Sequence, residues 1–176
     1  MLYDLKGAIM IQVCIQTLVV ATAPSPSILV LCPKEDYEHH LNCRIIPIWM
    51  GMSEATQLGM ALEGNRFARP MTHDLFIDAL TNLDTAVEHV NISKVEGQTF
   101  FAQLCLRQGN RNILLDARPS DAIALAVREN APIFIEEDVL SKASFPYIFK
   151  HGKNDEGELA EFRSFIQNIS PDDFQD

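Results

Sequence analysis

Strand-type and helix-type patterns come in separate blocks along this chain, and their order constrains the fold more than any other feature. Runs of β-branched or alternating apolar residues predict strands over residues 9–20, 28–31, 44–49, 87–95, 99–106, 113–115 and 132–135. Apolar residues at helical spacing predict helices over residues 53–63, 72–83 and 119–128. Blocks of strands separated by helices indicate an α+β fold, a mostly antiparallel mixed sheet with helices packed on it.

Turn-forming and capping residues predict where these elements begin and end. Ser53 and Thr72 are expected to cap the first two helices, and Gly64 is expected to end the first. The polar residues 33–42, which include two adjacent histidines, are expected to form a loop. The helix over 119–128 carries small apolar residues suited to close packing. The apolar face of the helix over 72–83 is expected to comprise Leu75, Ile77, Ala79, Leu80 and Leu83.

Charge divides the chain into an expected domain, residues 1–150, and an acidic C-terminal tail, residues 151–176. The net charge of the chain is −10, and seven acidic and two basic residues give the tail half of it. Apolar residues at helical spacing predict a helix over 158–169. An acidic chain has no general attraction for nucleic acid, so phosphate binding would need a local site.

Cysteine usage and the apolar N-terminal run indicate a cytoplasmic protein. The chain has four cysteines without a Cys-x-x-Cys pair, which predicts buried, reduced thiols rather than a zinc site. The run over residues 7–23 resembles a secretory signal, but two glutamines interrupt it and its alternation favours a strand. Pro24 and Pro26 follow too soon for a membrane-spanning helix. We therefore expect no contact with a membrane.

The charged residues near helix ends fall into two groups, those that stabilise their helix and those that do not. Glu54, Asp74 and Asp121 lie in the first turns of helices, where an acid is favourable by about 0.3–1 kcal/mol. Four other charged or titratable residues oppose the helix macrodipole, and helix stability does not explain them. These four are Arg69, His73 and Arg118 at helix starts and Glu63 at a helix end.

This arrangement fits two hypotheses. In the first, Arg69 and Arg118 and two helix N-termini bind phosphate, while His73 transfers protons. Asp74, Asp116 and Asp121 would then orient these groups or hold a divalent metal such as Mg²⁺. In the second, the arginines pair with acids in a structural network and His73 is a packing residue. Trp49 and Phe67 are expected in the core or in a site wall.

Several motifs resemble, in order, those of the bifunctional nuclease domain family. They are IPIWMG (46–51), SEA (53–55), ALEG (61–64), RPMTHDL (69–75), DARPSDAIALA (116–126) and API (131–133). The resemblance covers about residues 9–143, and it implies a compact α+β domain, often dimeric, with nuclease activity on DNA and RNA. The polar residues of these motifs are Glu54, Glu63, Arg69, Thr72, His73, Asp74, Asp116, Arg118, Ser120 and Asp121.

The sequence and this resemblance together predict a nuclease that hydrolyses phosphodiester bonds of DNA and RNA. The expected partners are nucleic acid, a second copy of the chain in a homodimer, and a protein that binds the acidic tail. We expect the catalytic residues to be His73, Asp74, Asp116, Arg118 and Asp121. We expect the substrate-binding residues to be Glu54, Glu63, Arg69, Thr72 and Ser120.

The alternative is a non-catalytic module that binds an anion or nucleotide, or a partner protein. The position of the two arginines distinguishes the two functions. An open cleft shared by Arg69, Arg118 and His73 would favour the enzyme. Burial of both arginines against Asp116 and Asp121 would favour the module.

Overall fold

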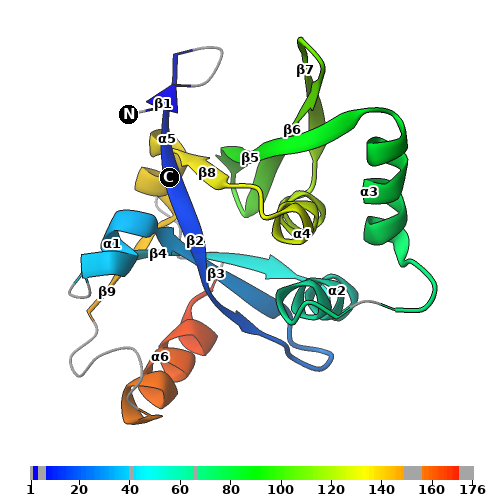
Figure 1. Cartoon of the computed structure of the whole chain (residues 1–176). Coiled ribbons are helices and arrows are strands. Elements are labelled where there is room, and N and C mark those ends of the chain that lie inside the picture. Colours follow the sequence, from blue (N-terminus) through cyan, green and yellow to red (C-terminus); the bar gives the residue numbers. More distant parts are fainter. Residues whose placement is uncertain (1, 4–6, 40–41, 66, 149–155, 171–176) are drawn as a thin grey trace.

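The computed structural model describes residues 2–3, 7–39, 42–65, 67–148 and 156–170 (Figure 1). Within these residues nine strands form one sheet in the order β7-β6-β5-β8-β2-β3-β4-β9, and β1 pairs with β2 beside this path. The strands are β1 (Leu2–Tyr3), β2 (Ile9–Val19), β3 (Ser27–Pro33), β4 (Cys43–Met50), β5 (Thr85–Glu96), β6 (Thr99–Gln108), β7 (Arg111–Ala117), β8 (Ile133–Glu136) and β9 (Phe145–Tyr147).

Strand β8 joins two antiparallel units of the sheet. Strands β2, β3, β4 and β9 pair antiparallel in one unit, and β5, β6 and β7 do so in the other. Between them, β8 pairs antiparallel with β2 and parallel with β5. The expected α+β class with a mostly antiparallel mixed sheet is therefore confirmed.

The helices cover both faces of the sheet (Figure 1). They are α1 (Lys34–His39), α2 (Met52–Leu62), α3 (Thr72–Asn82), α4 (Pro119–Glu129), α5 (Glu137–Ala143) and α6 (Glu156–Asn168). Helices α2, α4 and α5 contribute buried side chains to the larger core, and α6 contributes to a smaller one. No helix within the described ranges has the length and apolarity needed to cross a membrane.

Strand β3 shows why two cores form. All seven of its residues are buried, and side chains along a strand alternate between the two faces of the sheet. Leu29 and Leu31 belong to the larger core, whereas Ile28 and Val30 belong to the smaller core with α6. Trp49 packs, half-buried, against the smaller core and also lines a pocket there, so both positions expected for it are found.

Helix α4 packs closely because its buried side is made of small residues. Ala122, Ala124 and Ala126 are buried, and the helix contacts α2, β5 and β6. Pro119 occupies the first turn, and Asn130 ends the helix with a left-handed backbone (φ 54°). The predicted close-packing role of this helix is confirmed.

The helix caps differ from those expected. Helix α2 has Gly51 as its N-cap and α3 has Met71, so Ser53 and Thr72 lie inside the first turns. In α3 the backbone N–H of Met71 donates to Asp74 Oδ2 at 3.2 Å. The Asp74 carboxylate therefore accepts from the backbone N–H of the N-cap, the bond that the N3 side chain makes in a capping box. Gly64, with φ 68°, follows the end of α2 as expected.

Two other local expectations are wrong. Residues 34–39 form α1 instead of a loop, and its first turn carries two acids, which stabilise a helix N-terminus. His40 lies outside the described residues. Of the apolar face expected for α3, Leu75, Ala79 and the C-cap Leu83 are exposed, while Ile77 and Leu80 pack against the core. Helix α3 lies at the rim of the fold and meets α4 and β5 with one side only.

The four cysteines form no disulfide bond within the described residues. Cys32, Cys43 and Cys105 are buried, and Cys14 is half-buried. Burial and the negative charge of Glu88 raise the pKa of Cys105 to about 11. The expectation of buried, reduced thiols therefore agrees with three of the four positions.

Candidate functional site

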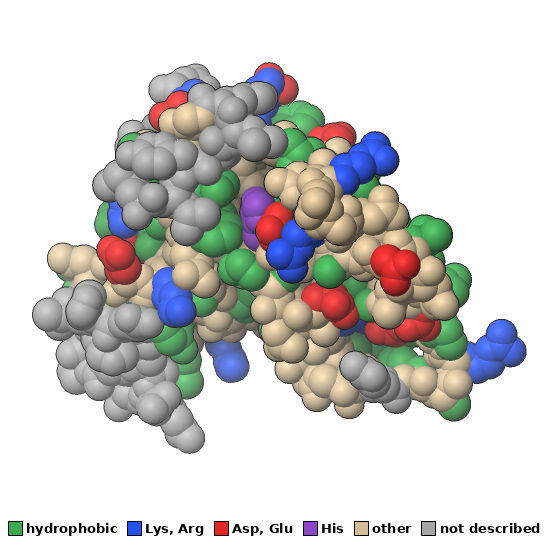
Figure 2. All heavy atoms as spheres, turned by 45° about the horizontal axis from the view of Figure 1, so that its top comes forward, with side chains coloured by type: hydrophobic (Ala, Val, Ile, Leu, Met, Phe, Trp, Pro, Cys, Tyr) green, Lys and Arg blue, Asp and Glu red, His purple; other side chains and the backbone are tan. Residues whose placement is uncertain are grey.

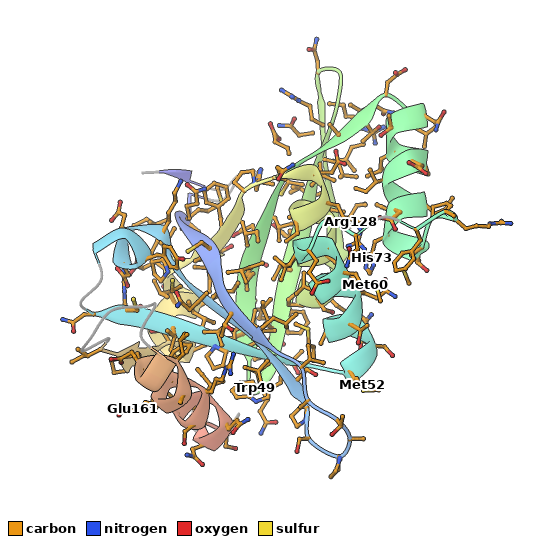
Figure 3. The ribbon with its side chains drawn as sticks, turned by 60° about the horizontal axis from the view of Figure 1, so that its bottom comes forward. Trp49, Met52, Met60, His73, Arg128 and Glu161 are labelled. Carbon is orange, nitrogen blue, oxygen red and sulfur yellow. The ribbon has the colours of Figure 1, made fainter. Side chains whose placement is uncertain are left out.

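Three helices contribute first-turn side chains to one cluster. Glu54 lies in the first turn of α2, His73 in that of α3 and Asp121 in that of α4. Arg118 is the N-cap of α4. We call Glu54, His73, Arg118 and Asp121 the ion-pair cluster. Figure 3 shows His73 where α2, α3 and α4 meet.

Asp121 holds the cluster together. Its Oδ2 accepts a hydrogen bond from Nε of Arg118 at 2.7 Å, and its Oδ1 lies 3.3 Å from Nε2 of His73. A second carboxylate, that of Glu54, accepts a hydrogen bond from Nη1 of Arg118 at 3.1 Å. The four residues come from three helices, so the packing of α2 and α3 beside α4 creates the cluster.

The two carboxylates explain how an arginine is tolerated at a helix start. The macrodipole alone disfavours a cation there, and Asp121 and Glu54 offset this with charge-assisted hydrogen bonds to Arg118. The Arg118 side chain nevertheless remains 65% exposed. A guanidinium has five N–H donors, and these two bonds use two of them. The other three are available to a ligand.

The contact with Asp121 also fixes the orientation of His73. A carboxylate can only accept a hydrogen bond, so Nε2 of His73 carries the hydrogen in this contact. In the neutral ring the lone pair is then on Nδ1. This atom is buried and has no hydrogen-bond partner among the described residues. An imidazole oriented by a carboxylate, with its second nitrogen unpaired, is suited to accept a proton.

The ion pairs of the cluster stabilise the charged forms of Asp121 and Arg118. Burial would raise the pKa of Asp121, but the hydrogen bond and charge of Arg118, together with the His73 contact, lower it overall. The hydrogen bond to Asp121 is the largest cause that raises the pKa of Arg118, and Glu54 adds to it. Asp121 and Arg118 are therefore both ionised at neutral pH. The formal charges of Glu54, Arg118 and Asp121 add to −1.

A second ion pair lies next to the cluster. Asp74 follows His73 in α3, and its Oδ1 accepts a hydrogen bond from Nε of Arg128 at 2.8 Å. Arg128, near the end of α4, is only 10% exposed and also donates to the backbone oxygen of Ala124 at 3.1 Å. The hydrogen bond from Arg128 is the main cause that lowers the pKa of Asp74.

Replacing Asp74 by asparagine is expected to lower the free energy of unfolding at pH 7 by about 1–2 kcal/mol, a moderate value because the side chain of Asp74 is 26% exposed. The pKa of Asp74 is lower in the folded state, so its stabilisation is complete above the unfolded-state pKa and is lost as pH falls through the folded-state pKa. The difference between the two proteins should therefore shrink between about pH 5 and pH 2.

Urea unfolding measured across this pH range tests the prediction. Asp138→Asn, which changes an exposed aspartate of α5, is the matched control and should stay within about 0.5 kcal/mol of the wild type at pH 7. A difference between wild type and Asp74→Asn that is independent of pH would contradict the role assigned to the Asp74–Arg128 pair.

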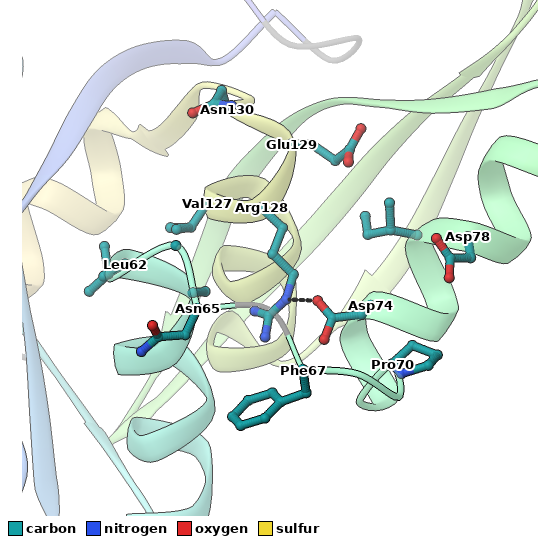
Figure 4. Close-up of a pocket in the computed structure, with 13 residues that line it drawn as sticks. Leu62, Asn65, Phe67, Pro70, Asp74, Asp78, Val127, Arg128, Glu129 and Asn130 are labelled. Atoms are coloured by element: carbon teal, nitrogen blue, oxygen red, sulfur yellow. Dashed lines mark hydrogen bonds and ion pairs between the residues drawn. The ribbon is translucent and has the colours of Figure 1, made fainter.

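A cleft of about 650 Å³ opens beside this ion pair (Figure 4). It lies between the end of α2, the loop that leads to α3, α3 itself and the end of α4. Phe67, which was expected in the core or in a site wall, lines this cleft and is 50% exposed. The lining residues are Ala61, Leu62, Gly64, Asn65, Phe67, Pro70, Asp74, Ile77, Asp78, Val127, Arg128, Glu129 and Asn130.

The sequence-predicted site residues divide into two groups. The structure brings together Glu54, His73, Arg118 and Asp121, and it places Asp74 beside them. In the part of the chain that the structure describes, the other predicted residues make no side-chain hydrogen bond or ion pair with this group. Arg69, Thr72 and Asp116 are exposed, Ser120 is half-buried, and Glu63 accepts a hydrogen bond from Asn65.

Sequence reasoning did not find Arg128. A cation near the C-terminal end of a helix is favoured by the macrodipole, so Arg128 has an ordinary explanation in the sequence. Only its burial and its contact with Asp74 connect it to the site. Both depend on how α3 packs against α4.

The arrangement does not fit a metal ion ligated by the protein alone. No three His, Cys, Asp or Glu side chains converge as ligands in the described ranges. The two carboxylates of the ion-pair cluster each accept a hydrogen bond from Arg118, so a divalent ion would have to compete with the guanidinium.

The chain has no general positive field that would attract nucleic acid, because its net charge is −10. On the face presented in Figure 2, the side chains of Lys and Arg are scattered among those of Asp and Glu, without an extended basic area over the described residues. A phosphate would therefore be held by directed donors such as those of Arg118 rather than by a general positive field.

Comparisons with known proteins agree with the motifs. A family model described as the bifunctional nuclease domain matches residues 37–147. The chain is 36% identical over 137 residues to uncharacterized protein Rv1829 of Mycobacterium tuberculosis, a match that covers 75% of this chain and 82% of the relative. Uncharacterized protein MT1877 from another strain of that organism gives the same values. The residues matched by the family model include the ion-pair cluster and the cleft.

Proposed function

Because the chain belongs to the bifunctional nuclease domain family, we propose that it hydrolyses phosphodiester bonds of DNA and RNA at the ion-pair cluster. The observation that carries this proposal is the pair of contacts made by Asp121. One carboxylate orients an exposed arginine and a histidine whose other ring nitrogen has no hydrogen-bond partner among the described residues. A purely structural ion pair needs neither the histidine nor the exposed guanidinium.

Arg118 binds the phosphodiester in this proposal. Its three unused N–H groups donate to the non-bridging phosphate oxygens, while Asp121 and Glu54 hold the guanidinium in place. As the bond to phosphorus breaks, negative charge builds up on these oxygens and the leaving oxygen. Donors fixed before the reaction stabilise that charge without reorganising.

His73 transfers the proton. Nδ1 accepts a proton from water as the water oxygen bonds to phosphorus, and Asp121 stabilises the imidazolium that forms. The phosphorus–oxygen bond to the leaving group breaks, and the leaving oxygen takes up the proton from His73. The products are a phosphate monoester and a free hydroxyl, with one water consumed for each bond cleaved.

The proposal requires a movement at the start of α3. Nδ1 of His73 is enclosed in the free protein, and the His73 side chain is 15% exposed. Substrate binding must therefore uncover Nδ1 before the proton moves. Small rearrangements of this kind are common when an active site closes around its ligand.

Replacing Arg118 by alanine is expected to lower the rate of cleavage by about 10²–10³-fold, the usual loss for a donor that stabilises transition-state charge. The assay uses end-labelled single-stranded DNA and RNA, purified folded proteins, and parallel reactions with a chelator. Arg111→Ala is the matched control, because Arg111 is an exposed arginine of β7 outside the site. Wild-type rates for Arg118→Ala, or no cleavage by the wild type, would contradict the proposal.

A further inference from the structure

The cleft beside the ion-pair cluster has features that the proposed chemistry does not use. It holds about 650 Å³, and volumes of this size accommodate small organic ligands. Its apolar wall includes Leu62, Pro70, Ile77 and Val127, and the aromatic ring of Phe67 is half exposed in it. A flat ligand with an apolar face and polar edges would match this combination.

The charge of the cleft excludes phosphate as its occupant. Three carboxylates line it, those of Asp74, Asp78 and Glu129, against the single guanidinium of Arg128. Arg128 is already bonded to Asp74 and to a backbone oxygen, as Figure 4 shows for the first of these bonds. The described lining residues therefore carry a net charge of −2, which repels an anion. Asp78 and Glu129 are exposed, and their carboxylates can accept hydrogen bonds.

We propose that this cleft binds one nucleobase of the nucleic-acid strand cleaved at the ion-pair cluster, and this inference rests on the proposed nuclease function. The base stacks on Phe67, and its amino or ring N–H groups donate to the carboxylates of Asp78 or Glu129. Guanine presents two adjacent donors on one edge, which match a carboxylate. Uracil and thymine present one donor between two acceptors, and they bind least well.

The position of the cleft suits a strand that also reaches the ion-pair cluster. Asp121 and Arg128 lie seven residues apart in α4, about 10 Å along the helix axis. Stacked nucleotides rise by roughly 3.4 Å each. A strand of a few nucleotides can therefore place a base against Phe67 and a phosphate against Arg118. The acidic cleft itself does not bind that phosphate.

Nucleoside titrations followed by amide chemical shifts test the inference without any cleavage. Guanosine is expected to shift the cleft residues, adenosine and cytidine to bind more weakly, and uridine to bind weakest. Phe67→Ala should weaken guanosine binding by about 5–100-fold, because stacking on the aromatic ring is lost. Phe67→Trp keeps an aromatic face and should retain binding. Phe76→Ala is the matched control, because Phe76 is an exposed phenylalanine of α3 that does not line the cleft.

A second set of titrations separates a base in a strand from a free nucleoside. A five-nucleotide DNA that contains guanine should bind more tightly than guanosine. In Arg118→Ala the affinity for this DNA should fall to that for guanosine, and the affinity for guanosine should not change. The inference would be overturned if guanosine did not bind, bound no better than uridine, or bound Phe67→Ala as well as the wild type. Displacement of guanosine by inorganic phosphate would also overturn it. Nucleosides cannot be cleaved, so loss of nuclease activity alone would leave this result intact.

Discussion

Replacing His73 by alanine is expected to lower the rate of DNA and RNA cleavage by about 10²–10⁴-fold, the usual contribution of a positioned general acid or base. The ring is held by Asp121 through Nε2, and Nδ1 has no partner in the described part of the chain. Alanine removes the group that accepts the proton and leaves Arg118 with both of its carboxylate partners. Single-turnover rates with saturating enzyme measure the chemical step directly.

The His73 result needs a stability measurement beside it. The His73 side chain is mostly buried, so truncation also removes packing, and the free energy of unfolding should fall. The rate is therefore compared at a temperature where both proteins are fully folded. A folded His73→Ala protein that cleaves at the wild-type rate would show that the histidine only packs against α4.

Replacing Phe162 by alanine is expected to lower the free energy of unfolding by about 3–5 kcal/mol, the usual range for truncating a buried phenylalanine. Phe162 is 2% exposed in the smaller core. Its ring meets that of Tyr147 edge-on, with 4.7 Å between centroids. Urea unfolding measures the loss.

A matched substitution on the surface provides the control for Phe162. Phe76→Ala changes a phenylalanine of α3 that is 39% exposed, and it should lower the free energy of unfolding by about 1–2 kcal/mol, well below the loss for Phe162→Ala. Equal stability of Phe162→Ala and the wild type would mean that α6 does not contribute to the folded structure.

The sequence predicted the elements with a strong apolar pattern well, and it did not predict the two shortest helices. The strand over 28–31 and the helix over 119–128 correspond to β3 and α4, because each has a strong apolar pattern. Helices α1 and α5 span six and seven residues, less than two full turns, so periodicity hardly shows. In α3, spacing correctly indicated a helix but not its buried side, because Leu75 and Leu83 have no neighbouring element to cover them.

Opposition to the helix macrodipole identified only part of the site, because His73 and Arg118 lie in the cluster but Arg69 does not. Arg118 conflicts with the macrodipole of α4, so a tertiary partner was required, and the structure supplies Asp121 and Glu54. Arg128 conflicts with nothing in its helix, and its contact with Asp74 depends on the packing of α3. The roles predicted for Arg69 and Asp116 stay predictions, since both side chains are exposed and lie outside the cluster.

The most direct test of one shared catalytic site is a double-mutant cycle on His73 and Arg118. Single-turnover cleavage of labelled single-stranded RNA is measured for the wild type, His73→Ala, Arg118→Ala and the double variant, with Arg111→Ala as the control. If Asp121 holds both residues on one phosphate, the double variant loses much less than the product of the two single losses. A loss in the double variant equal to the product of the two single losses would contradict a common site. Wild-type rates in all three variants would contradict it as well.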